Sequence, residues 1–343
     1  MAERIPVTVL TGYLGAGKTT LLNRILTGDH GRRYAVIVNE FGEIGIDGEL
    51  IVGAAEELFE MSNGCVCCTV RGDLIRTLHS LLDRTDHFNA IIVETTGLAD
   101  PGPVAQTFFV DPVLQARTRL DSVTTVVDAR HIGPRLADSR EAAEQIAFAD
   151  QIVLNKVELV DAVGLAAIEA RLRALNPLAP IHRASRADVA LDRILGCGGF
   201  DLDRIVGLEP AFLGHAHHPA HGEPGHVHDE HCGHAPAADH VHDSGIASVS
   251  LVAHAPMDRA RFDDWLTRLF ATRGADILRA KGIIDIAGED RRLVFQAVHM
   301  LLDGDLQRAW GRDEPRVSRL VFIGRNLDGA ALDAEFQACR ADH

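Results

Sequence analysis

The chain has 343 residues, 46% of them hydrophobic and 24% charged, which predicts about two globular domains and excludes bulk disorder. Its formal net charge of −15 argues against a general nucleic-acid or anionic-membrane binder, because both need a basic surface. No apolar run reaches the roughly 18 residues of a membrane span, and neither the first residues nor the six cysteines resemble a secreted protein. We therefore expect a cytoplasmic protein.

The first predicted elements frame a glycine-rich loop. A β-branched run over 5–10 predicts a strand, and apolar residues at helical spacing over 20–26 predict a helix. The loop between them follows the P-loop pattern G-x-x-x-x-G-K-S/T, in which backbone N–H groups wrap phosphates. Lys18 would reach the β- and γ-phosphates and Thr19 would ligate Mg²⁺, whereas the alternative is a plain turn. The nucleotide-binding residues predicted here are Gly12, Gly15, Ala16, Gly17, Lys18, Thr19 and Thr20.

A second predicted strand, over 34–39, runs into a segment rich in acidic residues and glycine. This segment contains Glu40 and Glu43 and lies where P-loop GTPases have their first switch. Three cysteines follow within four positions, at Cys65, Cys67 and Cys68. Thiolates prefer Zn²⁺ or similar ions, and three of them leave a tetrahedral ion one ligand short. We expect a metal site completed by a carboxylate of the acidic segment; the alternatives are buried thiols or a redox pair.

Two further strands are predicted over 90–94 and 122–127. The first ends in Glu94, three residues before Gly97, a pattern in which the acid orients a water and the glycine N–H meets the γ-phosphate. Glu94 is therefore the second predicted catalytic residue beside Lys18, unless it is only a solvated carboxylate at the end of a strand. The second strand ends in Asp128, to which the pattern assigns no more than a supporting role.

The strand predicted over 151–154 ends in Asn155, Lys156 and Glu158, the arrangement with which GTPases recognise guanine. The acid would accept from two guanine donors that adenine lacks, which gives strong discrimination. GTPases usually have Asp at this position, and Glu158 is one methylene longer. The alternative is an ordinary turn. The next predicted strand, over 180–182, leads into a small-residue loop where a backbone amide would face guanine O6.

The alternation of these strands with helices predicts a mostly parallel α/β sheet that is covered on both faces. Ligands of such sheets bind at the carboxyl ends of the strands, where all of these motifs fall. Residues 1–205 are therefore predicted to form a P-loop GTPase domain.

A histidine-rich tract follows, in which ten of the chain's 18 histidines fall between 215 and 242. Its composition predicts a flexible linker over 206–245 that captures Zn²⁺, Ni²⁺, Co²⁺ or Cu²⁺ through several weak sites; the alternative is a passive linker. The auxiliary metal ligands predicted here, together with Glu43, are His215, His217, His218, His221, His226, His228, His231, Cys232, His234, His240 and His242.

Beyond the tract, residues 246–343 predict a smaller α+β domain. Strands are expected over 246–252, 277–286, 292–300 and 317–323, with an amphipathic helix over 258–271 and another helix from about 328. Lys281, one of only three lysines, has no predicted chemistry.

Taken together, these segments resemble the CobW-type metallochaperone GTPases, which are related to the GTPases that assist nickel insertion into urease and hydrogenase. The resemblance covers nearly the whole chain and is made specific by the three-cysteine element. It rests on residues 12–20, 39–43, 65–68, 94–97, 155–158, 279–282 and 321–326.

The resemblance implies a P-loop domain followed by a CobW-type C-terminal domain, and GTP hydrolysis coupled to delivery of Zn²⁺ or Co²⁺ to a client protein. It favours Glu40, Cys67 and Cys68 as metal ligands over Cys65. We expect GTP·Mg²⁺ to order the acidic switch segment and tighten the thiolate site, and hydrolysis to release the ion to a client docked on the C-terminal domain or the switch. The sequence leaves the oligomeric state open, with a homo-oligomer as one alternative.

Alternative functions are a metal buffer regulated by GTP, a cobalt-handling factor in cobalamin synthesis, a small-metabolite kinase and a cysteine redox switch. No partner nucleic acid or membrane is expected.

Overall fold

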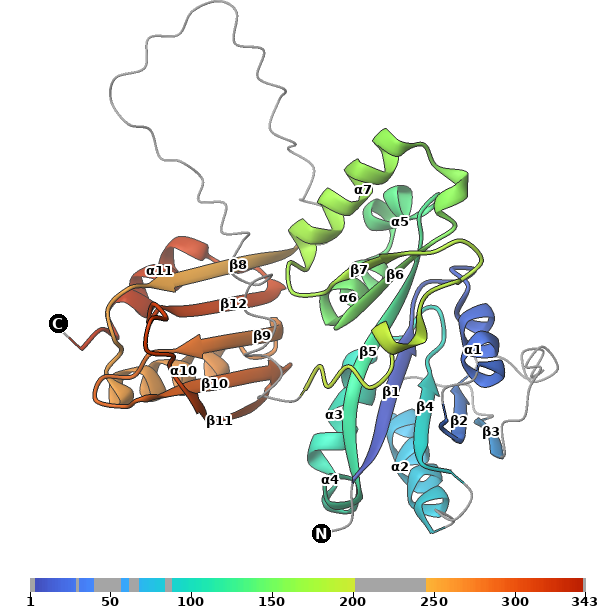
Figure 1. The fold of residues 1–343 in the computed structure, drawn as a ribbon, viewed down its shortest axis with the longest axis horizontal. Coiled ribbons are helices and arrows are strands. Elements are labelled where there is room, and N and C mark those ends of the chain that lie inside the picture. The colour runs from blue at the N-terminus through green and yellow to red at the C-terminus, as the bar shows by residue number, and fades with distance from the viewer. Residues whose placement is uncertain are drawn as a thin grey trace, which may run out of the picture.

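The computed structural model describes residues 4–28, 31–39, 57–61, 68–83, 88–200 and 245–341, with the backbone alone for 39, 57–61 and 68–71. These residues form two sheets with helices, as Figure 1 shows. The predicted linker over 206–245 lies outside the described residues except for Gly245. No helix among the described residues is long and apolar enough to cross a membrane.

The first sheet has seven strands in the order β3-β2-β4-β1-β5-β6-β7, and every neighbouring pair is parallel. This confirms the predicted α/β class. Its strands are β1 (Ile5–Thr11), β2 (Tyr34–Asn39), β3 (Glu57–Met61), β4 (Ala90–Glu94), β5 (Thr118–Asp128), β6 (Gln151–Asn155) and β7 (Ile181–Arg183).

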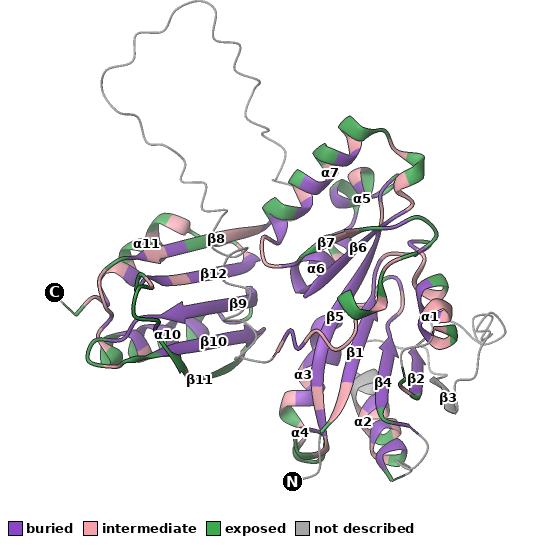
Figure 2. Cartoon of the chain, in the orientation of Figure 1, coloured by how far each residue is buried: buried purple, intermediate pink, exposed green. Residues whose placement is uncertain are grey.

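Successive side chains of these strands enter two separate cores, because strand side chains alternate between faces. Val9 and Ile91 belong to a core with the helices α2 to α7, whereas Leu10 and Ile92 belong to a core with α1 and residues 184–194. In Figure 2 the central strands β1, β4, β5 and β6 are accordingly mostly buried, while the outer faces of helices such as α1 and α7 are exposed. The helices are α1 (Lys18–Thr27), α2 (Cys68–Leu82), α3 (Pro101–Val110), α4 (Pro112–Arg117), α5 (Ile132–Asp138), α6 (Arg140–Phe148) and α7 (Ala162–Leu175), with the short 3-10 helices η2 (Val157–Leu159) and η3 (Leu191–Arg193).

The second sheet has five strands in the order β11-β10-β9-β12-β8, all antiparallel. On one face its side chains pack on two helices around Trp265, Phe262 and Phe336. The elements are β8 (Ile246–Ala253), α10 (Arg259–Arg273), β9 (Ile277–Ile284), β10 (Arg291–Val298), β11 (Leu301–Ala309), β12 (Ser318–Arg325) and α11 (Gly329–Gln337).

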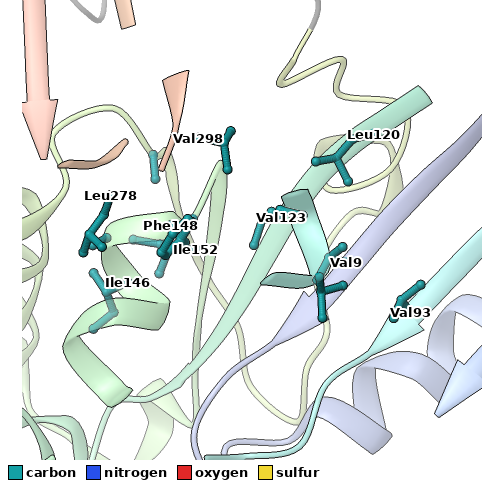
Figure 3. Packing of buried hydrophobic residues seen from close by; sticks show 14 of the residues in the cluster. Val9, Val93, Leu120, Val123, Ile146, Phe148, Ile152, Leu278 and Val298 are labelled. Carbon is teal, nitrogen blue, oxygen red and sulfur yellow. The ribbon is translucent and has the colours of Figure 1, made fainter. Parts of the chain in front are cut away.

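The other face of the second sheet packs on the first domain. Leu278 and Val298 belong to the same core cluster as Ile146, Phe148 and Ile152 of the parallel-sheet domain, and Figure 3 shows them side by side. The two sheets therefore share one continuous hydrophobic core.

A buried ionic cluster lies in this interface. Asp150, between α6 and β6, accepts hydrogen bonds from Arg279 and, at 3.2 Å, from Lys281 Nζ, both on β9. Lys281 Nζ also donates to Gly199 O at 3.0 Å, and the Arg279 guanidinium lies 4.4 Å from the Phe200 ring centroid. Lys281, which the sequence left without a role, thus joins the second domain to the end of the first.

Two strands were missed in the sequence. β3 is a short segment, Glu57–Met61, that contains two glutamates. β11 lies at the sheet edge and is largely exposed, so it lacks a buried face and the alternating pattern that would reveal it.

Candidate functional site

The predicted nucleotide-binding residues lie where the strands of the parallel sheet end. Register pairs Leu10 of β1 and Val38 of β2 with Glu94 of β4. On the other side of β1, Asp128 of β5 pairs with Asn155 of β6. The carboxyl ends of five strands therefore meet at one edge, where the P-loop leads from β1 into α1 (Figure 1).

The P-loop needs glycine at two positions for steric reasons. Gly12 has φ 140°, and a Cβ built there would lie 2.2 Å from Val126 O. Gly17 has φ 110°, and its Cβ would lie 2.5 Å from Asn155 Nδ2. Since L-residues rarely adopt these angles and the neighbours are close, the pattern read from the sequence is a requirement of the backbone.

The remaining P-loop residues lie around the start of α1. Lys18 begins the helix, and its Nζ donates to Gly12 O at 2.9 Å, so the side chain folds back over the loop. Thr19 is half-buried and Thr20 exposed on the first turn, while Gly15 is exposed and Ala16 buried. The structure thus brings together all seven residues predicted in this segment.

Asn155 joins the P-loop to the loop after β7. It is buried, its Nδ2 donates to Ala16 O at 2.9 Å, and its Oδ1 accepts from Ala187 N at 2.7 Å. Arg186 and Ala187 have φ of 50° and 56°, a left-handed turn that aims the Ala187 amide at Asn155. The small-residue loop predicted after this strand therefore lies next to the predicted base-recognition segment.

Lys156 and Asp128 form an ion pair beside the P-loop. Lys156 Nζ lies 2.7 Å from Asp128 Oδ2 and donates to Gly15 O at 2.7 Å. Burial raises the pKa of Asp128, but hydrogen bonds from His131 and Lys156 outweigh it and hold this pKa below its usual value. Glu158 lies on η2 and is exposed.

Glu94 and Gly97 lie on the other side of the P-loop. Glu94 ends β4 and is buried, with 5% exposure. A Cβ on Gly97 would lie 2.7 Å from Leu14 N, so this turn packs directly on the P-loop. Gln145 of α6, which the sequence did not single out, donates from Nε2 to Gly97 O and Ala99 O, both at 3.1 Å, and so fixes the turn.

A cavity of about 260 Å³ opens beside the P-loop. Its lining includes Gly15, Asp128, His131 and Lys156. A larger cavity of about 500 Å³ lies between the two sheets, lined in part by Phe200, away from the strand ends. The smaller cavity is therefore the one that belongs to the nucleotide edge.

Most of the predicted metal ligands fall outside the described residues: Glu40, Glu43, Cys65, Cys67 and the histidine-rich tract, including Cys232. Cys68 begins α2, where the backbone alone is described. The strands before the acidic and cysteine segments, β2 and β3, are paired, with Asn39 opposite Met61. Within the described part of the chain, no group of three or more His, Cys, Asp or Glu side chains could hold a metal.

Comparisons with known proteins identify both halves. Residues 6–183 match the family model "CobW/HypB/UreG, nucleotide-binding domain", and residues 246–340 match "Cobalamin synthesis protein cobW C-terminal domain". The chain is 36% identical over 341 residues to the zinc chaperone YjiA of Escherichia coli, covering 98% of this chain and 99% of the relative. It is 35% identical over 368 residues to the zinc chaperone CobW of a Sinorhizobium species, covering 98% and 97%.

The crystal structure of Zn(II)-bound YjiA GTPase from E. coli has the same fold, with a TM-score of 0.76 and 31% identity over 98% of this chain and 99% of that one. The matches extend across both domains and include the P-loop and the strand ends described above. The resemblance found in the sequence is therefore confirmed: the chain belongs to the CobW/HypB/UreG family, and it is a GTPase.

Proposed function

We propose that the chain is a metallochaperone that uses GTP binding and hydrolysis to load and release Zn²⁺ for a client protein. The observation that carries this proposal is the arrangement of strand ends. β2, which precedes the acidic segment, ends beside Glu94 of β4, and β3, which precedes the cysteine segment, ends beside β2 on the next strand of the sheet. The relatives named zinc chaperones support the choice of cargo.

For the nucleotide, we assign the phosphates to the P-loop backbone and to Lys18, which already folds over the loop. Asn155, Lys156 and Glu158 would recognise guanine. Asn155 supports this role because it fixes both the P-loop and the Ala187 amide. Glu158 is exposed and so accessible to a base.

The donor set near the phosphates fits Mg²⁺, which prefers oxygen ligands. Thr19 offers a half-buried hydroxyl on the first turn of α1, and Glu94 a buried carboxylate at the neighbouring strand end. Thr19 would hold the ion, and the bound ion would neutralise part of the phosphate charge. Glu94 would orient the attacking water, and the Gly97 amide would meet the γ-phosphate.

For the cargo, we assign Zn²⁺ to Cys67, Cys68 and Glu40, with Cys65 as the fourth candidate. Three thiolates and a carboxylate are a donor set that Zn²⁺ accepts in tetrahedral geometry. Co²⁺ accepts the same ligands and is the second ion to test. A client would dock on the C-terminal domain or on the segment after β2, where loading and hydrolysis are coupled.

The test is the Zn²⁺ and Co²⁺ affinity of the full chain and of a variant lacking residues 215–242, measured by chelator competition. Each protein is titrated with Mg²⁺ plus a GTP analogue, GDP or an ATP analogue. We expect tighter metal binding with the GTP analogue alone. By linkage, the metal must then tighten GTP-analogue binding by the same factor.

Two variants locate the site. Cys67→Ser should abolish the nucleotide-dependent part of the affinity. Cys197→Ser is the matched control, because Cys197 lies outside the three-cysteine element and its thiol donates to Arg193 O at 3.1 Å. Equal metal affinity in all nucleotide states would refute the coupling and leave a buffer. If GTP hydrolysis released zinc into solution and no metal-free client protein took it up, the proposed delivery to a client would be refuted.

A further inference from the structure

Asp128 ends β5 next to the P-loop; the sequence pattern assigns it no more than a supporting role, and the proposed function assigns it none. We propose that Asp128 is a positioning residue for guanine nucleotides: it holds Lys156 in the place where the lysine stem can cover the base. This inference rests on the proposed base-binding role of Lys156.

Asp128 is itself held rigidly. Its Oδ1 accepts from the backbone N–H groups of Arg130 at 2.9 Å and His131 at 3.3 Å. The His131 ring Nδ1 lies 3.0 Å from Oδ2. The carboxylate is only 11% exposed, so its position is set by the turn after β5 rather than by solvent.

Lys156 needs such an anchor. It follows β6 with φ 61°, a left-handed conformation that turns its side chain away from the strand direction. A lysine side chain has a flexible four-carbon stem and loses much rotamer freedom when its end is fixed. Here Nζ is fixed at two points, Asp128 Oδ2 and Gly15 O. Of these, only Asp128 carries a charge, and charge-assisted hydrogen bonds are the stronger ones.

The position of the pair decides which kinetic step it affects. The pair lines the cavity beside the P-loop and connects β5, β6 and the P-loop carbonyl of Gly15. The proposed hydrolytic residue Glu94 lies on β4, on the opposite side of β1. Losing Asp128 should therefore weaken binding of GTP and GDP alike and leave kcat at saturation unchanged.

The test is a double-mutant cycle on the full chain. Asp128→Asn removes the charge but keeps an oxygen for the two amides. Lys156→Met keeps the apolar stem but removes Nζ. Affinity for a fluorescent GDP and for a non-hydrolysable GTP analogue is measured in Mg²⁺ without zinc, together with kcat and KM for GTP.

We expect Asp128→Asn to weaken both nucleotides about tenfold, or about 1.4 kcal/mol. In the Lys156→Met background, the same change should have almost no effect. Asp138→Asn is the charge-matched control: Asp138 is exposed at the end of α5, and its replacement should leave affinity and KM unchanged. Should Asp128→Asn fold poorly, Asp128→Ser retains an oxygen for the backbone amides and tests the same point.

Wild-type affinity for Asp128→Asn, or an equal loss with and without Lys156, would overturn the positioning role. A fall in kcat with unchanged affinity would also overturn it. Failure of the proposed function is a separate outcome: wild-type protein would then bind ATP as well as GTP, whatever the residue at position 128.

Discussion

Replacing Asp150 with asparagine should test whether the buried ionic cluster joins the two domains. The Asp150 side chain is 1% exposed and faces Arg279 and Lys281, with side chains 2% and 8% exposed. In the wild-type protein, Asp150 Oδ2 accepts a hydrogen bond from Val123 N at 3.0 Å, and the asparagine oxygen can keep this bond. With that oxygen on Val123 N, Asp150→Asn removes the negative charge and places an amide N–H₂ in place of the Oδ1 that accepts from Arg279 and Lys281.

The expected loss follows from that burial. Removing one partner of a buried ion pair costs about 3–5 kcal/mol, because the remaining charge stays out of water. Whole domains are stable by only about 5–15 kcal/mol, so the effect is large. Lys281 retains one neutral acceptor, Gly199 O at 3.0 Å, which does not compensate a charge.

The loss should depend on pH with a defined sign. Burial lowers the pKa of Lys281 and Asp150 opposes this, so losing the Asp150 charge lowers the pKa further. The unfolded lysine has a pKa of about 10.4. At a pH between the folded-state and unfolded-state pKa values of Lys281, the unfolded chain binds more protons than the folded chain. The free energy of unfolding therefore rises with pH in this range. The deficit of Asp150→Asn should therefore shrink as the pH rises from 7 toward 10.

The assay is urea unfolding followed by tryptophan fluorescence at several pH values, since Trp265 lies in the second domain. Asp138→Asn, with the same chemical change at an exposed position, should change the free energy of unfolding by less than about 0.5 kcal/mol. A deficit below about 1 kcal/mol at pH 7, or one that grows with pH, would refute this account of the cluster.

Three further changes test other contacts. Asn155→Ala should weaken GTP tenfold or more in a nucleotide titration, because it unties the P-loop from Ala187; unchanged affinity would contradict the bridge. Gln145→Ala should lower kcat several-fold in a phosphate-release assay, because it removes the two hydrogen bonds to the turn that carries Gly97. An unaltered kcat would mean that this turn keeps its conformation without Gln145. Asp111→Ala should cost about 1 kcal/mol in thermal unfolding, because Asp111 caps α4 through two amides, and Asp111→Ser should recover most of it.

The parts of the fold that could be predicted from the sequence are those that depend on neighbouring residues in the chain. Buried strands such as β1 and β4 consist mainly of apolar and β-branched residues, and the P-loop glycines are required by local backbone angles. The edge strand β11 left no such pattern, because most of its residues face solvent.

The site shows the same division. Lys18 and Asn155 could be found because each belongs to a short motif at the end of a strand. Gln145 could not, because its role depends on contact with Gly97, 48 residues earlier. Lys281 was noticed for its rarity, but its partner Asp150 lies 131 positions away and on another domain. Such contacts follow from the packing of domains, which no local spacing encodes.

The core shared between the two sheets has a consequence for how the chain can be divided. Leu278 and Val298 complete a cluster that otherwise belongs to the parallel-sheet half, and Asp150 neutralises cations of the other half. Each half alone would expose an apolar face and unpaired charges, so neither is a self-sufficient module. We expect that, if the chain were cut once between 201 and 244, the two fragments would stay associated through the shared core and the buried ion pair. The contact between the two halves therefore does not depend on the histidine-rich tract alone, because it is made by packed side chains and buried charges on both sides.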